Sequence, residues 1–485
     1  MQLHGPGLSL RAEAQLESGA QNPLLGALMK TFSNQYDKEK NPKGVVNVGL
    51  AENVCSPSPP LQLFYVASFP CLASKLMLSR PQSLLHDWLI AFFERQGTLK
   101  LLHTDLTYGQ SILGSNRIFS ALSSTYARFF NPVTPVKAEH ICTSNGVSSM
   151  IEHLAACTAD EGDCWLIPAP YYNGFTMDLN ATSKVGIASV QIPEGQHGEL
   201  GEVEVLEKEL QRRAMDETLP KVTAVLVTNP HNPLGFCYTA DVLLEYCRFA
   251  ERHNLWLIVD EIYALSVFDS HDLDSPRPFT SILSVDVFKE AGCNPARVVQ
   301  LYGMSKDFGA NGLRAGNLVC QHNPKLVGAL ASTAMPMRMG SPTDALWSAL
   351  LNSPELPTYL SMNRRALSGA YAYLSAWLRA HNIPYRPANA GHFILADFRT
   401  LVSPSEGKGG QRQLSKEQEI AFLNRLVDEA LVYFGPGFSY EVEPYGFFRL
   451  TFCIRRPDLE VALSRVEKMC NLSSKALELS KQYPV

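Results

Sequence analysis

The chain has 485 residues, of which 46% are hydrophobic and 18% are charged, a composition typical of a soluble globular protein. Its 42 basic and 47 acidic residues give a net charge of −5, so charge offers no reason to expect nucleic acid or an anionic membrane as a partner. The length favours two domains, or one large domain with a smaller partner. We therefore expect small-molecule partners.

The first 20 residues lack a basic segment followed by an apolar run, so we expect neither a secretory signal nor a transmembrane helix. A cytoplasmic protein is the expectation. The 11 cysteines are scattered without a CxxC pair, which favours reduced thiols over disulfides or zinc. No metal site is expected.

Residues 1–45 suggest an irregular arm with helical pieces, and 45–53 suggest a short extended segment. From residue 84 onward, helical patterns alternate with short apolar strands. The predicted helices lie at 86–96, 148–159 and 241–254, and the predicted strands at 138–145, 164–170, 189–194, 223–230, 255–263 and 297–303. This alternation predicts an α/β fold with a mostly parallel sheet covered on both faces.

The pattern changes after about residue 335 to a long helix through 372–382 and apolar strands at 391–399 and 446–456. A polar, glycine-rich segment at 403–419 is predicted to be a surface loop. We assign the chain as follows: 1–53 as an N-terminal arm and part of a small domain, 54–82 as an anomalous insertion, 83–335 as the large domain, and 336–485 as the small C-terminal domain.

Lys306 lies in LYGMSKDFGANGLRAG, after an apolar segment and eight residues before Arg314. A desolvated amine near other cations has a lowered pKa and can attack an aldehyde, while an arginine and glycines can hold a phosphate. Pyridoxal phosphate needs this combination. A surface lysine in a polar turn is the alternative for this segment alone.

Asp260 follows an apolar run in LWLIVDEIY, where an unpaired buried carboxylate would be costly. A protonated pyridine nitrogen would be a suitable cationic partner, and Tyr263 and Asn232 could bind the phenolate oxygen of the same ring. A helix cap or a buried salt bridge would also explain Asp260, and NPHNPLG alone could be a proline-fixed turn.

Taken in order, the segments GLAEN, YG, NGVSS, PYYNGF, TNPHNPLG, DEIY, SKDFGANGLRAG and FFRLTF resemble the fold type I pyridoxal-phosphate enzymes of the class I and II aminotransferase superfamily. The closest resemblance is to the branch of 1-aminocyclopropane-1-carboxylate (ACC) synthases, across roughly residues 40–470 without the insertion. It implies a large domain with a mostly parallel central sheet and helices on both faces, and a smaller α+β domain.

The resemblance also implies residue roles. Lys306 would bind the cofactor covalently and then move the substrate's α-proton, and Arg449 would bind the α-carboxylate as a bidentate pair. Tyr108 would reach the phosphate from a neighbouring subunit, which implies a homodimer. The remaining implied cofactor contacts are Asp260, Tyr263, Asn232, Tyr172, Gly146, Val147, Ser148, Ser305 and Arg314, and Glu52 matches a glutamate typical of the ACC synthase branch.

Two positions depart from the family pattern. Gly303 stands where the family usually has a serine that hydrogen-bonds the phosphate, so we expect weaker cofactor binding unless Ser305 or water compensates. Met177 stands where plant ACC synthases carry an arginine beside the substrate pocket. We therefore expect ACC formation to be absent or minor.

Residues 54–82 split GLAEN from SLLHDWL, which follow each other directly in the family. The codons of Val54 and Cys55 can spell GTATGT and that of Gln82 can be CAG, the usual borders of a short intron. We hypothesise a retained intron, and transcript reads that keep this segment in frame would refute it. A mobile loop near the pocket is the alternative.

The resemblance implies a pyridoxal-phosphate enzyme acting on an α-amino acid, similar to enzymes of specialised metabolism. We favour an aminotransferase, because transamination needs no special leaving group. A lyase, of the ACC synthase or carbon-sulfur type, is the first alternative. A catalytically silent protein that keeps the fold is the second.

Overall fold

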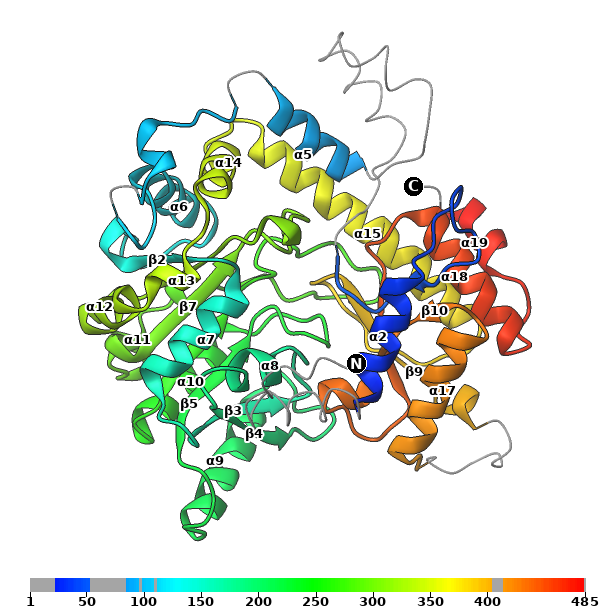
Figure 1. Cartoon of the computed structure of the whole chain (residues 1–485). Coiled ribbons are helices and arrows are strands. Elements are labelled where there is room, and N and C mark those ends of the chain that lie inside the picture. The colour runs from blue at the N-terminus through cyan, green and yellow to red at the C-terminus, as the bar shows by residue number, and fades with distance from the viewer. Residues whose placement is uncertain (1–21, 53–83, 96–97, 109–110, 404–412, 484–485) are drawn as a thin grey trace, which may run out of the picture.

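The computed structural model describes residues 22–52, 84–95, 98–108, 111–403 and 413–483 (Figure 1). The predicted insertion at 54–82 lies outside these residues. None of the helices in the described ranges combines the length and the apolar composition that a bilayer crossing needs.

A seven-stranded sheet forms the centre of the larger part of the molecule, in the order β2-β8-β7-β6-β5-β3-β4. Its strands are β2 (Ile141–Ser144), β3 (Cys164–Ala169), β4 (Gly186–Gln191), β5 (Val222–Thr228), β6 (Trp256–Asp260), β7 (Val298–Gly303) and β8 (Gly316–Val319). The strands β7, β6, β5, β3 and β4 pair in parallel in that order across the sheet, whereas β8 runs antiparallel to both β7 and β2. The predicted mostly parallel sheet is confirmed. The pattern missed β8, because four residues after a glycine-rich turn carry too little periodicity.

Helices cover both faces of this sheet, as continuous apolar strands require. The helices of this part are α5 (Leu84–Glu94), α6 (Asn116–Phe129), α7 (Val147–Thr158), α8 (Phe175–Asn180), α9 (Leu200–Ala214), α10 (Ala240–Arg252), α11 (Val287–Ala291), α12 (Pro324–Ser332), α13 (Ala334–Met337) and α14 (Ser341–Leu351). Ala224 and Leu226 of β5 share a core with α7, α8 and α12. Val225 and Val227 belong to the core that includes α6, α9 and α10. Alternate residues of one strand thus build two cores.

A smaller antiparallel sheet, in the order β11-β12-β9, lies beside the central one. Its strands are β9 (Phe393–Asp397), β11 (Gly435–Pro436) and β12 (Phe447–Thr451), and the helices around it are α2 (Pro23–Ser33), α15 (Leu356–Ala380), α16 (Arg399–Val402), α17 (Lys416–Asp428), α18 (Arg456–Met469) and α19 (Ala476–Gln482). β1 (Val46–Asn47) pairs in parallel with β10 (Val432–Tyr433), which ties the N-terminal segment to this part. The strand predicted at 45–53 is therefore shorter than expected.

Two further expectations concern the loop predicted at 403–419 and the domain boundary predicted at residue 335. The predicted loop at 403–419 ends earlier, because Ser415 and Gln418 form a capping box that starts α17 at Lys416. The boundary at residue 335 stays a prediction. Beyond it, α14 still packs against α6, and α15 runs from beside α5 toward α19 (Figure 1).

Candidate active site

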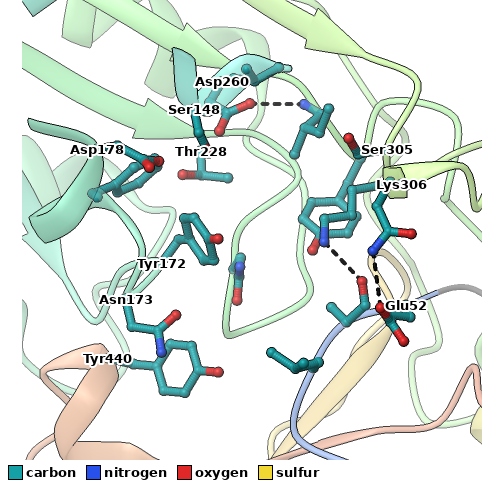
Figure 2. A pocket seen from close by; sticks show the side chains of 18 of the residues that line it. Glu52, Ser148, Tyr172, Asn173, Asp178, Thr228, Asp260, Ser305, Lys306 and Tyr440 are labelled. Atoms are coloured by element: carbon teal, nitrogen blue, oxygen red, sulfur yellow. Dashed lines mark hydrogen bonds between the residues drawn. The ribbon is translucent and has the colours of Figure 1, made fainter. Parts of the chain in front are cut away.

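A cavity of about 300 Å³ opens at the carboxyl ends of β5, β6 and β7, next to the first turn of α7. Such an edge is where open α/β sheets bind ligands. The segment 49–52, α2 and β12 supply its other walls. It is lined by every predicted site residue except Gly146 and Tyr108, namely Glu52, Val147, Ser148, Tyr172, Asn232, Asp260, Tyr263, Ser305, Lys306, Arg314 and Arg449 (Figure 2).

Lys306 follows β7 and turns its amine into this cavity (Figure 2). Its Nζ donates a hydrogen bond to the carbonyl oxygen of Ala51 at 2.9 Å. Burial, and then the positive charge of Arg449, lower the pKa of the Lys306 amine from 10.5 to about 8. About a tenth of the amine is therefore uncharged, and nucleophilic, at pH 7, far more than for an ordinary lysine.

Asp260 ends β6 and lies beside Thr228, its paired residue on β5. The residue is 5% exposed, and its Oδ1 accepts the backbone N–H of Ile262 at 3.1 Å. Burial raises the pKa of the Asp260 carboxyl to about 7, and the nearby Asp178 acts in the same direction. A cation at this carboxyl would offset the cost of burying it.

Arg449 lies on β12 and is 3% exposed. Its Nη1 donates to Oδ1 of Asn232 at 2.9 Å, and its Nη2 donates to the carbonyl oxygen of Gly49 at 2.6 Å. The guanidinium also stacks on two rings, Phe393 at 4.7 Å and Tyr440 at 4.6 Å from the ring centroids. Its Nε has no hydrogen-bond partner in the described part of the chain. A buried cation without a facing carboxylate suits an anionic ligand group.

The turn before α7 and Arg314 together form an anion cradle. Gly146 precedes the helix with φ of 87°, and a Cβ there would collide with the Arg314 guanidinium. Gly316 is equally constrained, because its Cβ would lie 2.6 Å from the backbone nitrogen of Val147. Arg314 is held by a 2.8 Å hydrogen bond from Nη1 to the carbonyl oxygen of Asn311. Backbone N–H groups of α7 and a guanidinium thus meet at one point, as phosphate groups prefer.

Tyr172, Tyr263 and Glu52 complete the predicted set around the cavity. Burial raises the pKa of Tyr172 to about 12 and that of Tyr263 well above its usual value, so both phenols stay protonated and can donate hydrogen bonds. The Glu52 carboxylate accepts a hydrogen bond from Nδ2 of Asn311 at 3.1 Å. These side chains face the same space as Lys306 (Figure 2).

The structure bears on three further expectations. Tyr108 is 72% exposed and does not line this chain's own cavity, so its role toward a neighbouring subunit stays a prediction. Met177 is 74% exposed and does not line the cavity, although its neighbour Asp178 does, so the charge change beside the pocket stays a prediction. A Cβ at Gly303 would lie 2.7 Å from the carbonyl oxygen of Ala315. The missing serine there reflects close packing of β7 on β8.

Sequence reasoning missed several residues of the cavity. Asp178 is the clearest, because its Oδ2 is buried without a partner among the described residues, and burial raises its pKa to about 6. It is the neighbour of Met177 in FTMDL, the segment in which the sequence pattern pointed to Met177 alone. Thr228 ends β5 and lies two residues before the end of the strand predicted at 223–230. The others are Leu28, Gly49, Leu50, Ala51, Ile151, Asn173, Phe175, Ile262, Asn311, Tyr433 and Tyr440.

Behind Lys306 lies a packed polar cluster that the motifs did not predict. Asp307 is fully buried and accepts hydrogen bonds from the Leu265 N–H at 2.9 Å, the Ser266 hydroxyl at 2.5 Å and the Tyr302 hydroxyl at 2.9 Å. Ser266 Oγ also lies 3.0 Å from Nε2 of His392, whose ring meets Tyr263 edge-on. The cluster therefore braces the segment that carries the lysine.

The family described as "Aminotransferase class I and II" matches residues 106–466. The "Probable aminotransferase gliI" of Aspergillus fumigatus is 34% identical over 76% of this chain and 82% of its own length. The "1-aminocyclopropane-1-carboxylate synthase-like protein 1" of Bos taurus is 29% identical over 90% of this chain and 78% of its own length. The "Probable inactive 1-aminocyclopropane-1-carboxylate synthase-like protein 2" of Mus musculus is 29% identical over 89% of this chain and 67% of its own length.

Solved structures share the fold. An aspartate aminotransferase from Thermus thermophilus with maleate aligns with a TM-score of 0.67 at 18% identity, covering 96% of this chain and all of that one. This likeness confirms the expected fold type I architecture. Because the family match spans most of the sequence and the Aspergillus relative exceeds 30% identity over most of its own length, the chain belongs to the aminotransferase class I and II family.

Proposed function

We propose that this protein is a pyridoxal-phosphate-dependent aminotransferase acting on an α-amino acid. The observation that carries the proposal is the joint placement of Lys306, Asp260 and Arg449 around one cavity. Among the described residues, Asp260 and Arg449 form no ion pair, and the Lys306 amine has a lowered pKa. The amine, the buried carboxyl and the buried guanidinium are complementary to different parts of the same cofactor and substrate. The membership of the chain in the aminotransferase class I and II family supports transamination as the reaction.

The residues present fit pyridoxal phosphate. Among the described residues, Asp178 Oδ2 has no hydrogen-bond partner and Asp260 accepts one backbone N–H, and the cradle at Arg314 is lined by glycines. These features leave room for a phosphorylated, cationic ring. Arg314 and the amides near Gly146, with the hydroxyls of Ser148 and Ser305, would hold the phosphate. Tyr172 would lie against the ring, and Tyr263 and the Asn232 amide would donate to its phenolate oxygen.

In the proposed reaction, Arg449 binds the substrate's α-carboxylate through its Nε edge and orients the α-carbon toward Lys306. The Lys306 amine would take up the α-proton of the substrate. Asp260 would pair with the protonated ring nitrogen of the cofactor. When bound, pyridoxal phosphate supplies the electron sink for the carbanion.

The assembly and location follow from the same proposal. An exposed Tyr108, away from its own chain's cavity, supports a homodimer in which each subunit completes the other's phosphate site. We place this homodimer in the cytoplasm, with an amino acid or a derivative of one as its small-molecule partner.

Carbon-sulfur or ACC-type elimination is the second candidate, and one observation favours keeping it. Met177 is exposed and does not line the cavity, which weakens the charge argument against the ACC synthase reaction. Similarity to the ACC synthase-like protein 1 of Bos taurus points the same way, whereas the name of the mouse relative, "Probable inactive", fits the silent alternative. The expectation of little or no ACC formation stays a prediction.

A keto-acid test separates the candidates. The purified holoenzyme is incubated with a panel of amino acids and thioether conjugates, with and without a 2-oxo acid acceptor. Transamination predicts product formation that depends on the acceptor. Release of ammonia, thiol or ACC without an acceptor would replace the proposal by a lyase. Protein that binds no cofactor and turns over no substrate would contradict both and favour a silent member of the fold.

A further inference from the structure

A second cavity, of about 750 Å³, lies apart from the candidate active site and shares no lining residue with it. Its walls are the C-terminal end of α6, the segments 264–269 and 276–279, and the middle of α15. The side chains of Leu265 and its neighbours separate it from Asp307, which the backbone of the same segment contacts. The cavity therefore backs onto the polar cluster behind Lys306.

The charge of this cavity contrasts with that of the chain. Four arginines line it, Arg128, Arg277, Arg364 and Arg365, against a single carboxylate, Asp269. The whole chain carries −5. Excess positive charge concentrated in a concave surface attracts anions, because low-dielectric walls focus the field.

Three of these arginines are exposed and have no hydrogen-bonded or ionic partner among the described residues, although the Arg128 guanidinium lies 5.0 Å from the centroid of the Phe129 ring. Arg277 donates to the carbonyl oxygen of Gly198 at 2.8 Å and pairs with Glu199. By contrast, Arg128, Arg364 and Arg365 form no ion pair and no hydrogen bond in the part of the chain that the structure describes. Farther along α15, Arg379 pairs at 2.7 Å with Asp272, which lies outside the helix in the segment that follows residues 264–269. An arginine of the same helix is thus neutralised by a neighbouring segment, whereas Arg364 and Arg365 are not.

The floor of the cavity is apolar and held in place. Phe129, Phe268 and Phe279 line it together with two prolines. The Ser368 hydroxyl donates to the carbonyl oxygen of Asp269 at 2.6 Å, which joins α15 to the segment 264–269. Asn389 Nδ2 donates to the carbonyl oxygen of Arg277 at 2.8 Å and fixes the opposite wall.

We propose that this cavity is a binding site for a compact multivalent oxyanion, a small molecule with two or more phosphate or carboxylate groups. Arg364 and Arg365 come from one turn of α15 and Arg128 from α6, so separate oxyanion groups can be gripped from two directions. Guanidinium groups favour such ligands because they donate bidentate hydrogen bonds and stay charged. A single negative charge would leave most of the cluster unneutralised.

Titration calorimetry on the holoenzyme tests the site, with sodium pyrophosphate and citrate as separate probes at low ionic strength. The holoenzyme is used so that the phosphate cradle at Arg314 is filled. We expect one site per chain for at least one probe, and the probe that binds identifies phosphate or carboxylate as the recognised group. In the Arg364→Gln/Arg365→Gln variant, the affinity should fall about tenfold or more, because two charge-assisted contacts are lost.

The matched control is Lys289→Gln/Lys325→Gln, which removes two exposed positive charges outside the cavity. It should change the affinity less than about twofold at the same salt concentration. Equal losses in both variants would overturn the proposal, as would absence of binding to the wild type or undiminished binding to Arg364→Gln/Arg365→Gln. If that variant fails to fold, Arg128→Gln on α6 makes the same comparison. Amino-acid turnover should stay at the wild-type level in every variant, since these residues lie outside the active-site cavity.

Discussion

Buried carboxyls lie on both sides of Lys306, but they differ in the number of hydrogen bonds that they accept. On the cavity side, Asp260 accepts one backbone N–H, and Asp178 Oδ2 and Arg449 Nε have no partner among the described residues. On the opposite side, Asp307 accepts three hydrogen bonds. Burial raises the pKa of both Asp260 and Asp307 to about 7, so the pKa does not distinguish them. The number of hydrogen bonds that each carboxyl accepts does distinguish them. A buried carboxyl with few donors can bind a ligand, whereas a carboxyl whose oxygens are already hydrogen-bonded supports the structure around it.

The largest expected effect comes from Lys306 itself. Lys306→Ala should lower turnover by at least about 10³-fold, because both covalent capture and proton transfer are lost. Intact mass after borohydride reduction should show no cofactor adduct in the variant and a full adduct in the wild type. Lys325→Ala, an exposed lysine outside the cavity, is the control and should keep the adduct. An adduct retained in Lys306→Ala would refute the assignment.

The second largest effect is expected from removing the Arg449 guanidinium, which lies on the cavity side of Lys306. Arg449→Gln should lower kcat/KM by about 10- to 100-fold, because the α-carboxylate loses a charge-assisted pair. Most of the change should appear in KM for the amino acid. Arg455→Gln, which lies six residues along the chain and pairs with Asp458, is the control and should leave KM unchanged. A wild-type KM in Arg449→Gln would show that the carboxylate binds elsewhere.

Disturbing the polar cluster around Asp307, behind Lys306, should lower the stability of the fold rather than substrate binding. Asp307→Asn should lower the free energy of unfolding at pH 5 by about 2 kcal/mol, because well-made buried hydrogen bonds are disturbed. The pKa of Asp307 is raised from 3.8 to about 7 in the folded state. The wild type therefore loses stability through this group as pH rises between about 4 and 7, and the variant does not.

The difference between the two proteins should thus shrink from pH 5 to pH 8, as measured by chemical denaturation at several pH values. Other buried carboxyls titrate in both proteins and cancel in the comparison. Parallel stability profiles would show that Asp307 does not titrate as its environment suggests. A raised KM in the variant would place Asp307 with the substrate-binding groups instead.

The smallest effect is expected at Gly303. Gly303→Ser should cost about 1 kcal/mol of stability, because its Cβ would lie 2.7 Å from the Ala315 carbonyl oxygen. It should not tighten cofactor binding, since the tight packing of β7 on β8 leaves no relaxed position for the side chain. Equilibrium dialysis of pyridoxal phosphate against both proteins checks this. Tighter binding in the variant would restore the view that this chain lacks a phosphate ligand.

The local pattern suggested part of the candidate site, and the family resemblance supplied the rest. Lys306 and Asp260 could be proposed from the pattern because each follows an apolar run that indicates a buried strand. Asp178 could not, since a carboxylate in the middle of a short helix faces a cavity only when that helix docks on α7. Met177, its neighbour, does not line the cavity, because adjacent residues of a helix point about 100° apart.

The sequence by itself determined the alternating α/β order, the parallel strands and the strand-end residues, because apolar periodicity and local turn chemistry act over a few residues. Tertiary structure alone decided the antiparallel insertion of β8, the pairing of Arg449 with Asn232 and the gathering of Arg128 with Arg364 and Arg365. Each of these joins segments far apart in the chain. Their proximity depends on how helices and sheets pack, which local patterns do not encode.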